Sequence, residues 1–177
     1  MPPELRGSRL DLRPLAAADE ELYCAIYTDI ELMRLVAAPL TADSAQRAFA
    51  AARVANASGQ SHLAYWVLAE RHQRMDIGLL GLLGQAMSDT AQVGAMILPA
   101  WHSRGYAAEA IAALADYAFS TLRLNRLHTR HAAANAAANG LMAKLGFVLT
   151  GTAAAGAHGH RWELRREHWR RAGLHAR

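Results

Sequence analysis

The 177-residue chain has little of what several classes of protein require, beginning with cysteine. Its one cysteine, Cys24, excludes an intrachain disulfide and a thiolate metal cluster, which is typical of a reducing compartment. The first ten residues lack the apolar stretch of a secretory signal, and no apolar run approaches the roughly 20 residues of a membrane span. We therefore expect a cytoplasmic protein without a membrane partner.

The common glycine-rich nucleotide motifs are also missing. The sequence has neither the Gly-Lys-Ser/Thr of a P-loop nor the glycine triplet of a dinucleotide fingerprint. The run IGLLGLLG, residues 77–84, contains three glycines, but it reads as an apolar strand. Bulges or close sheet packing explain these glycines better than a phosphate loop does.

What the chain does contain is apolar material and positive charge. A hydrophobic content of 53% is enough for a full core, and the length predicts one domain over residues 1–177. The net charge of +4 favours anionic partners. Clustered C-terminal arginines are more often a solvated face than a nucleic-acid site, so nucleic-acid binding is not expected. The cluster comprises Arg161, Arg165, Arg166, Arg170, Arg171 and Arg177.

Hydrophobic periodicity predicts a mixed α+β domain with a single core. Alternating leucines in residues 9–15 indicate a half-buried strand. Helical spacing follows in 18–28 and in 42–56, where Asp43 or Ser44 is the candidate cap. Further strands are expected at 63–70, 77–84, 92–98, 126–132 and 147–151, further helices at 106–122 and 135–146, and a final arm at 160–169.

The stretch PAWHSRGYAAEA, residues 99–110, carries the most specific chemical signal. Pro99 ends the preceding strand because it has no N–H to donate, and the first amides of the following helix have no partner within it. Gly105 and Ala107 are too small to keep a ligand off the backbone, and Arg104 adds positive charge. The pattern indicates a phosphate site at a helix N-terminus, with an ordinary strand-to-helix turn as the alternative.

At these residues the chain resembles the GNAT acetyltransferases. HSRGYA is similar to their acyl-CoA signature Gln/Arg-x-x-Gly-x-Gly/Ala, with His102, Gly105 and Ala107 at the specified positions. GYAAEA resembles the Gly-Tyr-Ala-x-Glu-Ala of the RimJ/RimL-like branch, whose members acetylate protein N-termini, small amines or polyamines. Further matches at RLDLRPL (9–15), ELMRLV (31–36), MDIGLLGL (75–82) and NAAANGLMAKLGF (135–147) extend the resemblance over residues 8–170.

The resemblance implies a fold and a co-substrate. The GNAT fold is a twisted, mostly antiparallel sheet of six to seven strands with about four helices, whose fourth and fifth strands splay apart to admit the pantetheine of acetyl-CoA. The backbone edge of Met96, Ile97 and Leu98 would pair with pantetheine. Asn135 would cap its helix and also touch the cofactor. The pyrophosphate loop would comprise His102, Ser103, Arg104, Gly105, Tyr106, Ala107 and Ala108.

Direct acetyl transfer to an amine needs an oxyanion site, a base and a proton for the departing thiolate. A backbone N–H near Met96 or Ile97 would serve the oxyanion. His131 is the candidate base because it stands beside the expected splay, where the family usually has an apolar residue. A hydrogen-bonded structural histidine is the alternative. The positions at which the family places acids hold Gln92, Ala138 and Met142 instead.

Four other residues complete the candidates. His62 and Tyr65, near the second of the three central strands, are candidate substrate contacts. His158 and His160 resemble a metal pair, but their glycine-containing turn offers no third ligand. We therefore assign no metal to the protein.

These observations predict an acetyl-CoA-dependent N-acetyltransferase that acts on a primary amine, either a protein N-terminus or a small amine. The basic charge of the chain favours an acidic acceptor over a polyamine. The alternatives are a CoA-binding sensor or scaffold without transfer activity, and a resistance or detoxification acetyltransferase on the same fold. A homodimer is compatible with the sequence.

Overall fold

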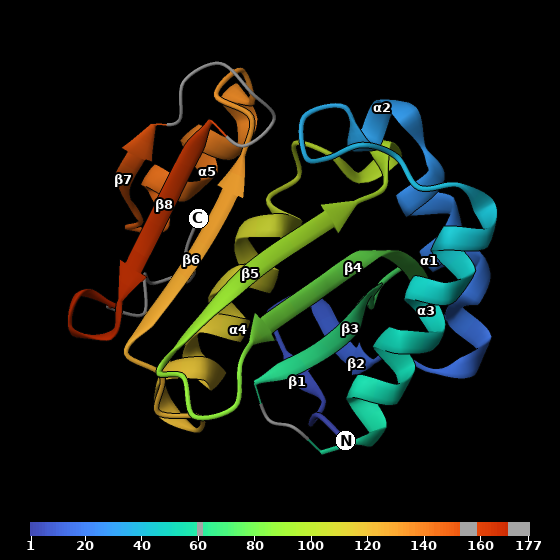
Figure 1. The fold of residues 1–177 in the computed structure, drawn as a ribbon, viewed down its shortest axis with the longest axis horizontal. Helices are drawn as coiled ribbons and strands as arrows, with labels where there is room; N and C mark the ends of the chain where they lie inside the picture. The colour runs from blue at the N-terminus through green and yellow to red at the C-terminus, as the bar shows by residue number, and fades with distance from the viewer. Residues whose placement is uncertain (60–61, 153–158, 170–177) are drawn as a thin grey trace.

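Eight strands of the described residues form one sheet, in the order β1-β2-β3-β4-β5-β6-β8-β7 (Figure 1). The computed structural model describes residues 1–59, 62–152 and 159–169. The strands are β1 (Leu5–Arg6), β2 (Leu10–Pro14), β3 (Leu63–Glu70), β4 (Met75–Gly84), β5 (Thr90–Ile97), β6 (Arg126–His131), β7 (Val148–Thr152) and β8 (His160–Arg165). The α-helices are α1 (Glu20–Thr28), α2 (Ile30–Met33), α3 (Ala42–Ala57), α4 (Tyr106–Ser120) and α5 (Ala136–Lys144).

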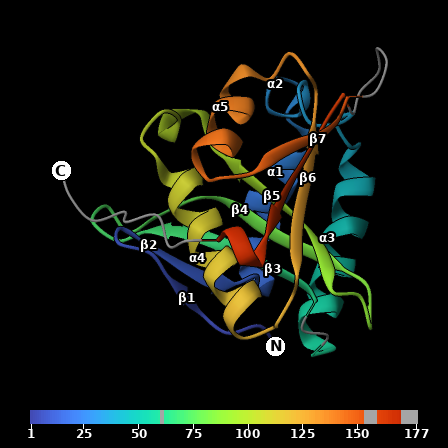
Figure 2. The same cartoon turned by 90° about the vertical axis from the view of Figure 1, so that its left-hand side faces the viewer.

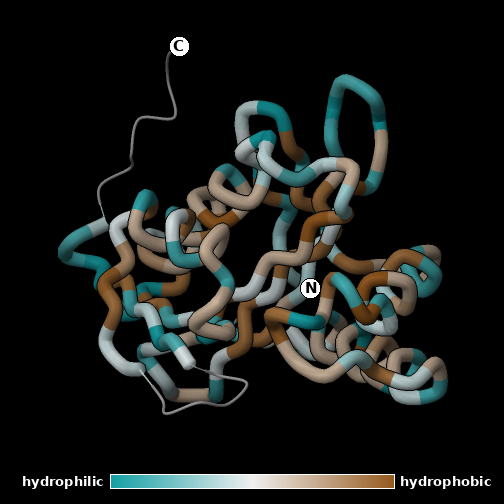
Figure 3. The backbone as a smooth tube through the Cα atoms, turned by 90° about the horizontal axis from the view of Figure 1, so that it is seen from above, coloured by the Kyte–Doolittle hydropathy of each residue, from teal (hydrophilic) through white to brown (hydrophobic). Residues whose placement is uncertain are grey.

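The helices divide between the two faces of the sheet (Figures 1 and 2). α4 and α5 lie on one face, whereas α1 and α3 cover the other face over β3 and β4. Successive residues of β3 serve both cores, since Trp66 packs in the cluster with α4 and Val67 in the cluster with α1 and α3. Figure 3 shows hydrophobic residues gathered where these layers meet and hydrophilic residues in the outlying loops.

The predicted α+β fold and the order of its longer elements are confirmed. The sheet gains a strand because the two-residue β1 pairs with β2, so the splay falls between β5 and β6. α2 was not predicted, since four residues give no periodic signal. The predicted cap of α3 is wrong: Thr41 Oγ1 accepts from the N–H of Ser44 at 3.3 Å, which leaves Asp43 and Ser44 inside the helix.

No helix in the described part of the chain is both long and apolar enough to span a membrane.

A buried carboxylate joins β2 to the first turn of α4. The side chain of Glu109 is 3% exposed and accepts from the N–H groups of Arg9 and Leu10 and from Arg9 Nε, the latter two at 3.0 and 2.9 Å. Arg9 Nη1 also donates to the carbonyl of Arg104 at 3.0 Å, and its guanidinium lies 4.3 Å from the ring centroid of Tyr106. The N-terminal strand therefore holds the turn that precedes α4.

We expect Glu109→Ala to lower the free energy of unfolding by about 3 kcal/mol, because a guanidinium and two amides lose their acceptor. Denaturant titration of variant and parent measures the difference. The control Glu31→Ala removes an exposed carboxylate beside Arg34 and should change stability by less than about 0.5 kcal/mol. A loss no larger than that of the control would contradict a stabilising role for Glu109.

Candidate active site

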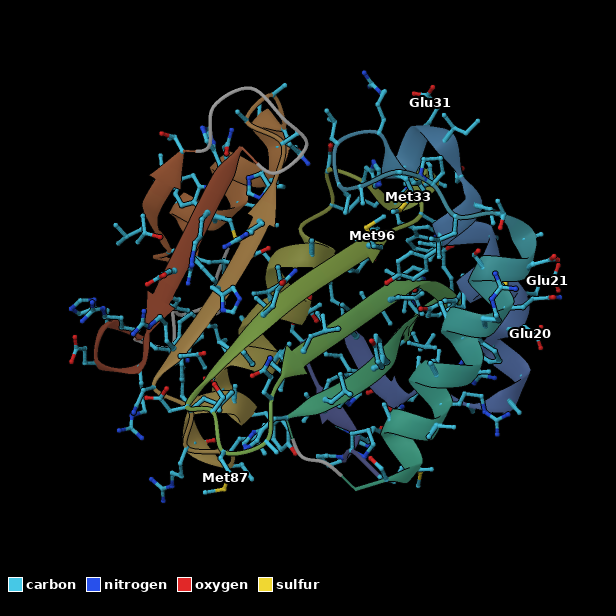
Figure 4. All side chains as sticks on the ribbon, in the orientation of Figure 1. Glu20, Glu21, Glu31, Met33, Met87 and Met96 are labelled. Atoms are coloured by element: carbon cyan, nitrogen blue, oxygen red, sulfur yellow. The ribbon has the colours of Figure 1, made fainter. Side chains whose placement is uncertain are left out.

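The site forms where β5 and β6 separate. These strands run parallel and pair only over 90–92 and 126–128. Beyond this point β5 continues to Ile97 and β6 to His131 without pairing to one another, and Figure 1 shows them diverging. A cavity of about 480 Å³ opens at the divergence, lined by both strands, α1, α5 and the segment after α2. Figure 4 shows Met33 of α2 beside Met96 at the end of β5, where α2 closes this end of the cavity.

The backbone edge that β5 turns toward the splay belongs to Ile97 rather than to Met96. The N–H of Leu98 donates to the carbonyl of Ile77 at 2.8 Å, on the β4 side. Backbone groups alternate between the two edges of a strand from one residue to the next. Met96, two residues before Leu98, therefore also directs its N–H and carbonyl toward β4, whereas those of Ile97 face the splay. This corrects the expectation that Met96, Ile97 and Leu98 all present a free edge. His102 Nε2 donates to the carbonyl of Ile97 at 2.7 Å, which leaves the Ile97 N–H as the oxyanion candidate.

The glycines of β4 fit close packing and not a phosphate loop. A Cβ on Gly78 would collide with the carbonyl oxygen of Met96 and stand 3.0 Å from Ile97 Cα. This contact also places the Met96 carbonyl on the β4 side of β5. The packing interpretation of the 77–84 run is therefore confirmed at Gly78.

The turn between β5 and α4 exposes backbone donors. The first hydrogen bond of α4 runs from the N–H of Glu109 to the carbonyl of Gly105 at 3.1 Å. The amides of Tyr106, Ala107 and Ala108 consequently have no acceptor within the helix. Gly105 has a φ of 82°, in the left-handed region that favours glycine. The geometry suits an anion that approaches the backbone at the positive end of the helix dipole.

Two guanidinium groups stand at this turn. Arg104 is exposed, with its guanidinium 5.1 Å from the ring centroid of Trp101. Arg9 Nη2 lies 3.5 Å from the position of a Cβ on Gly105. Sequence reasoning missed Arg9, since 95 residues separate it from Arg104 and no local pattern connects them.

His131 lies on the cavity wall in a network that was not foreseen. Its ring is 5% exposed and stacks on Trp162 with 15° between the ring planes. Asn139 Oδ1 lies 3.0 Å from His131 Nε2 and 3.0 Å from His160 Nδ1. The Asn139 amide nitrogen donates to the carbonyl of Ala133 at 3.0 Å, which fixes the orientation of the amide. The His131 and His160 rings therefore meet at one oxygen.

This network defines the proton positions on His131. Because Asn139 Oδ1 can only accept, His131 Nε2 must carry a proton. In the neutral ring Nδ1 is then the basic nitrogen. The structure thus gives His131 the hydrogen bond expected of a structural histidine and leaves its other nitrogen able to accept a proton.

Three phenols line the cavity, although only Tyr65 was a predicted substrate contact. The rings of Tyr23 and Tyr27, both on α1, have centroids 4.5 Å apart. Burial raises the pKa of Tyr27 to about 12 and also raises the pKa of Tyr23 and of Tyr65. All three are therefore proton donors at neutral pH. Sequence reasoning did not identify Tyr23 and Tyr27, because their helical spacing carries no signal for a cavity wall.

His62, the other predicted substrate contact, does not line the cavity. Its carbonyl accepts from the N–H of Gly84 at 2.6 Å, and its Nδ1 is buried without a hydrogen-bond partner in the described part of the chain. This position at the start of β3 gives no support to a substrate contact.

The positions at which the family places acids do reach the cavity: Gln92, Ala138 and Met142 all line it. Asn135 lines it as well, and its Oδ1 accepts from the N–H of Ala138 at 3.1 Å as the helix cap. Of the suspected metal pair, His158 lies outside the described residues and His160 is bound to Asn139. Among residues 1–59, 62–152 and 159–169, no group of three His, Cys, Asp or Glu side chains could hold a metal ion.

The model of the acetyltransferase (GNAT) domain matches residues 9–148, and the chain belongs to this family. The uncharacterized N-acetyltransferase YoaA of Bacillus subtilis (strain 168) is 29% identical over 151 residues, which are 84% of this chain and 85% of that protein. An acetyltransferase structure from Agrobacterium tumefaciens str. C58 is 26% identical with a TM-score of 0.78 and covers 92% of this chain and 94% of its own. Mycobacterium smegmatis RimJ in complex with CoA-disulfide shares the fold at 17% identity and a TM-score of 0.73, covering 93% of this chain and 87% of its own. The protein is thus a GNAT acyltransferase.

We expect Gly105→Val to weaken acetyl-CoA binding by about tenfold or more, because a branched side chain at a φ of 82° strains the turn and blocks the approach to the backbone. Calorimetry on the folded proteins measures the affinity. The control Gly59→Val places the same side chain at a φ of 70° with nothing within 4 Å, and should leave the affinity unchanged. Equal affinities of Gly105→Val and parent would remove the phosphate-loop assignment.

Proposed function

We propose that the protein transfers the acetyl group of acetyl-CoA directly to a primary amine, the N-terminus of a protein or a small amine. The observation that carries this proposal is the cavity at the splay of β5 and β6, which has His131 and three phenols on its walls. When bound, acetyl-CoA supplies an acetyl thioester. The donor-rich turn at the start of α4 fits its pyrophosphate.

The residues around the cavity fit the two ends of acetyl-CoA differently. The amides of Tyr106, Ala107 and Ala108 would bind the pyrophosphate, with Arg9 and Arg104 adding positive charge. The carbonyl of Ile97, which keeps a second lone pair beside its bond to His102, would accept from an amide of pantetheine as in strand addition, and the N–H of Ile97 stays for the oxyanion. The thioester end would then reach the splay beside α5.

His131 acts as the general base in this proposal. The amine nitrogen bonds to the acetyl carbon and gives its proton to His131 Nδ1, while Asn139 holds the ring through Nε2. The N–H of Ile97 stabilises the oxyanion. As the carbon–sulfur bond breaks, the thiolate takes a proton from solvent or from one of the phenols of the cavity wall. Thiolates leave readily, so correct positioning supplies much of the rate.

We expect His131→Gln to lower kcat more than it raises the KM for acetyl-CoA, and to remove the acid limb of the pH–rate profile. A base acts only when deprotonated, and glutamine keeps a donor for Asn139 but no titrating nitrogen. The control His72→Gln changes an exposed histidine outside the cavity and should leave the profile intact. An unchanged profile in His131→Gln would assign this residue a structural role only.

We expect Ala138→Ser to raise kcat modestly at an unchanged affinity for acetyl-CoA, because it restores a hydroxyl near the departing sulfur. Steady-state kinetics with an accepted amine measures both quantities. The control Ala137→Ser adds the same hydroxyl at an exposed position of α5. The hypothesis that the protein lacks a general acid for the thiolate would be contradicted by two results together. These are a parent turnover already within the ordinary range of about 1 to 10³ per second and no gain in Ala138→Ser.

A thiol-release assay over a panel of small amines and N-terminal peptides tests the proposed function itself. We expect acetyl-CoA-dependent thiol release with at least one class of amine. Tight acetyl-CoA binding without transfer to any amine would contradict the proposal and favour a CoA-binding sensor.

A further inference from the structure

One face of β6 and β8 carries like charges directly opposite each other. In the antiparallel register Arg130 faces Arg161 and Arg126 faces Arg165. Alternate residues of a strand share a face, so all four guanidinium groups project from the same side of the sheet. Like charges at opposed positions destabilise a sheet. These four residues are called the basic strip.

The charges of the basic strip are only partly balanced. Glu163 contacts Arg126 Nη1 at 3.2 Å and Arg161 Nη2 at 3.0 Å, and Glu167 lies 3.7 Å from Arg165 Nη1, so two carboxylates serve three of the four arginines. Arg161 Nε is buried and has no hydrogen-bond partner in the described residues. Arg130 is exposed, and its side chain forms no ion pair or hydrogen bond within the described residues. The strip therefore keeps guanidinium donors that an anion could satisfy.

His128 stands between the two arginine pairs and does not add charge. Burial lowers the pKa of His128, and the positive charge of Arg161 lowers it further. Its Nδ1 is buried without a partner in the described part of the chain. The ring is thus neutral at neutral pH, with an unsatisfied polar atom beside the guanidinium groups.

The basic strip starts at the cavity and leads away from it. Arg130 lines the cavity, and it immediately precedes His131 on β6. Four residues earlier on the same strand, Arg126 and Arg165 line a second hollow of about 210 Å³. At about 3.3 Å per residue, the two arginine pairs lie about 13 Å apart, a distance that about four residues of an extended peptide span. The second hollow is also lined by Asn125, Arg166 and Glu167.

This part of the sheet is accessible. The basic strip lies on the face of the sheet that α1 and α3 cover over β3 and β4. None of the described helices lies over the strip itself (Figures 1 and 2). Figure 4 shows Glu20 and Glu21 on the outer side of α1, far from β6 and β8. Their carboxylates therefore do not neutralise the strip.

We infer that the acceptor is the N-terminal segment of an acidic peptide or protein, whose amine enters the cavity while carboxylates of its following residues bind the basic strip. This inference rests on the proposed acetyl transfer and names its substrate class. A small amine with one carboxylate would reach only the pair of Arg130 and Arg161. A polyamine would be repelled by the same groups.

Acetyl transfer to matched peptides tests the inference. The peptides share an N-terminal serine, followed by acidic, neutral amide or basic residues, and spermidine serves as the polyamine. We expect kcat/KM for the acidic peptide to exceed that for the neutral peptide by about tenfold or more, with lower values for the basic peptide and spermidine. The preference should shrink as ionic strength rises, because salt screens exposed charges.

A charge reversal locates the effect on the basic strip. We expect Arg130→Glu to abolish the preference for the acidic peptide and to raise its KM by about tenfold, with the KM for acetyl-CoA within about twofold of the parent. The control Arg53→Glu makes the same charge change at an exposed position of α3 and should keep the preference. Arg130→Gln provides a milder variant, in which the preference should be reduced.

Equal kcat/KM values for acidic, neutral and basic peptides would overturn the inference and leave acetyl transfer intact. If no peptide is acetylated, calorimetry measures the binding of each peptide to the CoA-saturated protein and so tests the inference without the transfer reaction. Preferential binding of the acidic peptide that Arg130→Glu abolishes would keep the inference and contradict the proposed transfer. Binding without preference would overturn the inference as well.

Discussion

Where β5 and β6 stop pairing, the sheet contains an interior strand edge that no neighbouring strand satisfies. Unsatisfied backbone groups inside a protein are costly, so such an edge needs a partner. The carbonyl of Ile97 accepts from the ring of His102, whereas the pairing of β6 with β8 uses the opposite edge of β6 and leaves the edge toward β5 open. The cavity and the position of His131 on its wall both follow from this separation.

The turn that follows β5 depends on a distant part of the chain. Arg9 and Glu109 bring β2 against the first turn of α4, and Arg9 also holds the carbonyl of Arg104. A charged pair with backbone donors orients this turn more firmly than a single cap would. The geometry of the turn at the start of α4 is thereby coupled to the integrity of the N-terminal strands.

The fold and the turn at Gly105 could be predicted because their signals are local. Alternating and helical periodicities mark the longer elements, and the Gly105 turn has a recognisable spacing. The sequence could not predict which residues of β5 direct their N–H and carbonyl groups toward β4 and which toward the splay. No residue type distinguishes Met96 from Ile97 in this respect. β1 and α2 are too short to produce a period.

The parts of the site that were missed are long-range side-chain arrangements. Tyr23 and Tyr27 fit a helix core as well as a cavity wall, and only the packing of α1 decides between them. Asn139 meets His131 and His160 because α5 folds onto the β6–β8 pair, a contact that sequence spacing does not reveal. The role of His131 as a base stays a prediction.

The opposed arginines of β6 and β8 have a consequence for the stability of the fold. A sheet with like charges face to face is less stable than one in which they are interspersed, and residues kept at such a cost commonly serve binding. An anion bound between these arginines would relieve the repulsion, and the recovered free energy would add to its affinity. Such binding would raise the melting temperature of the protein through the same strands that frame the cavity.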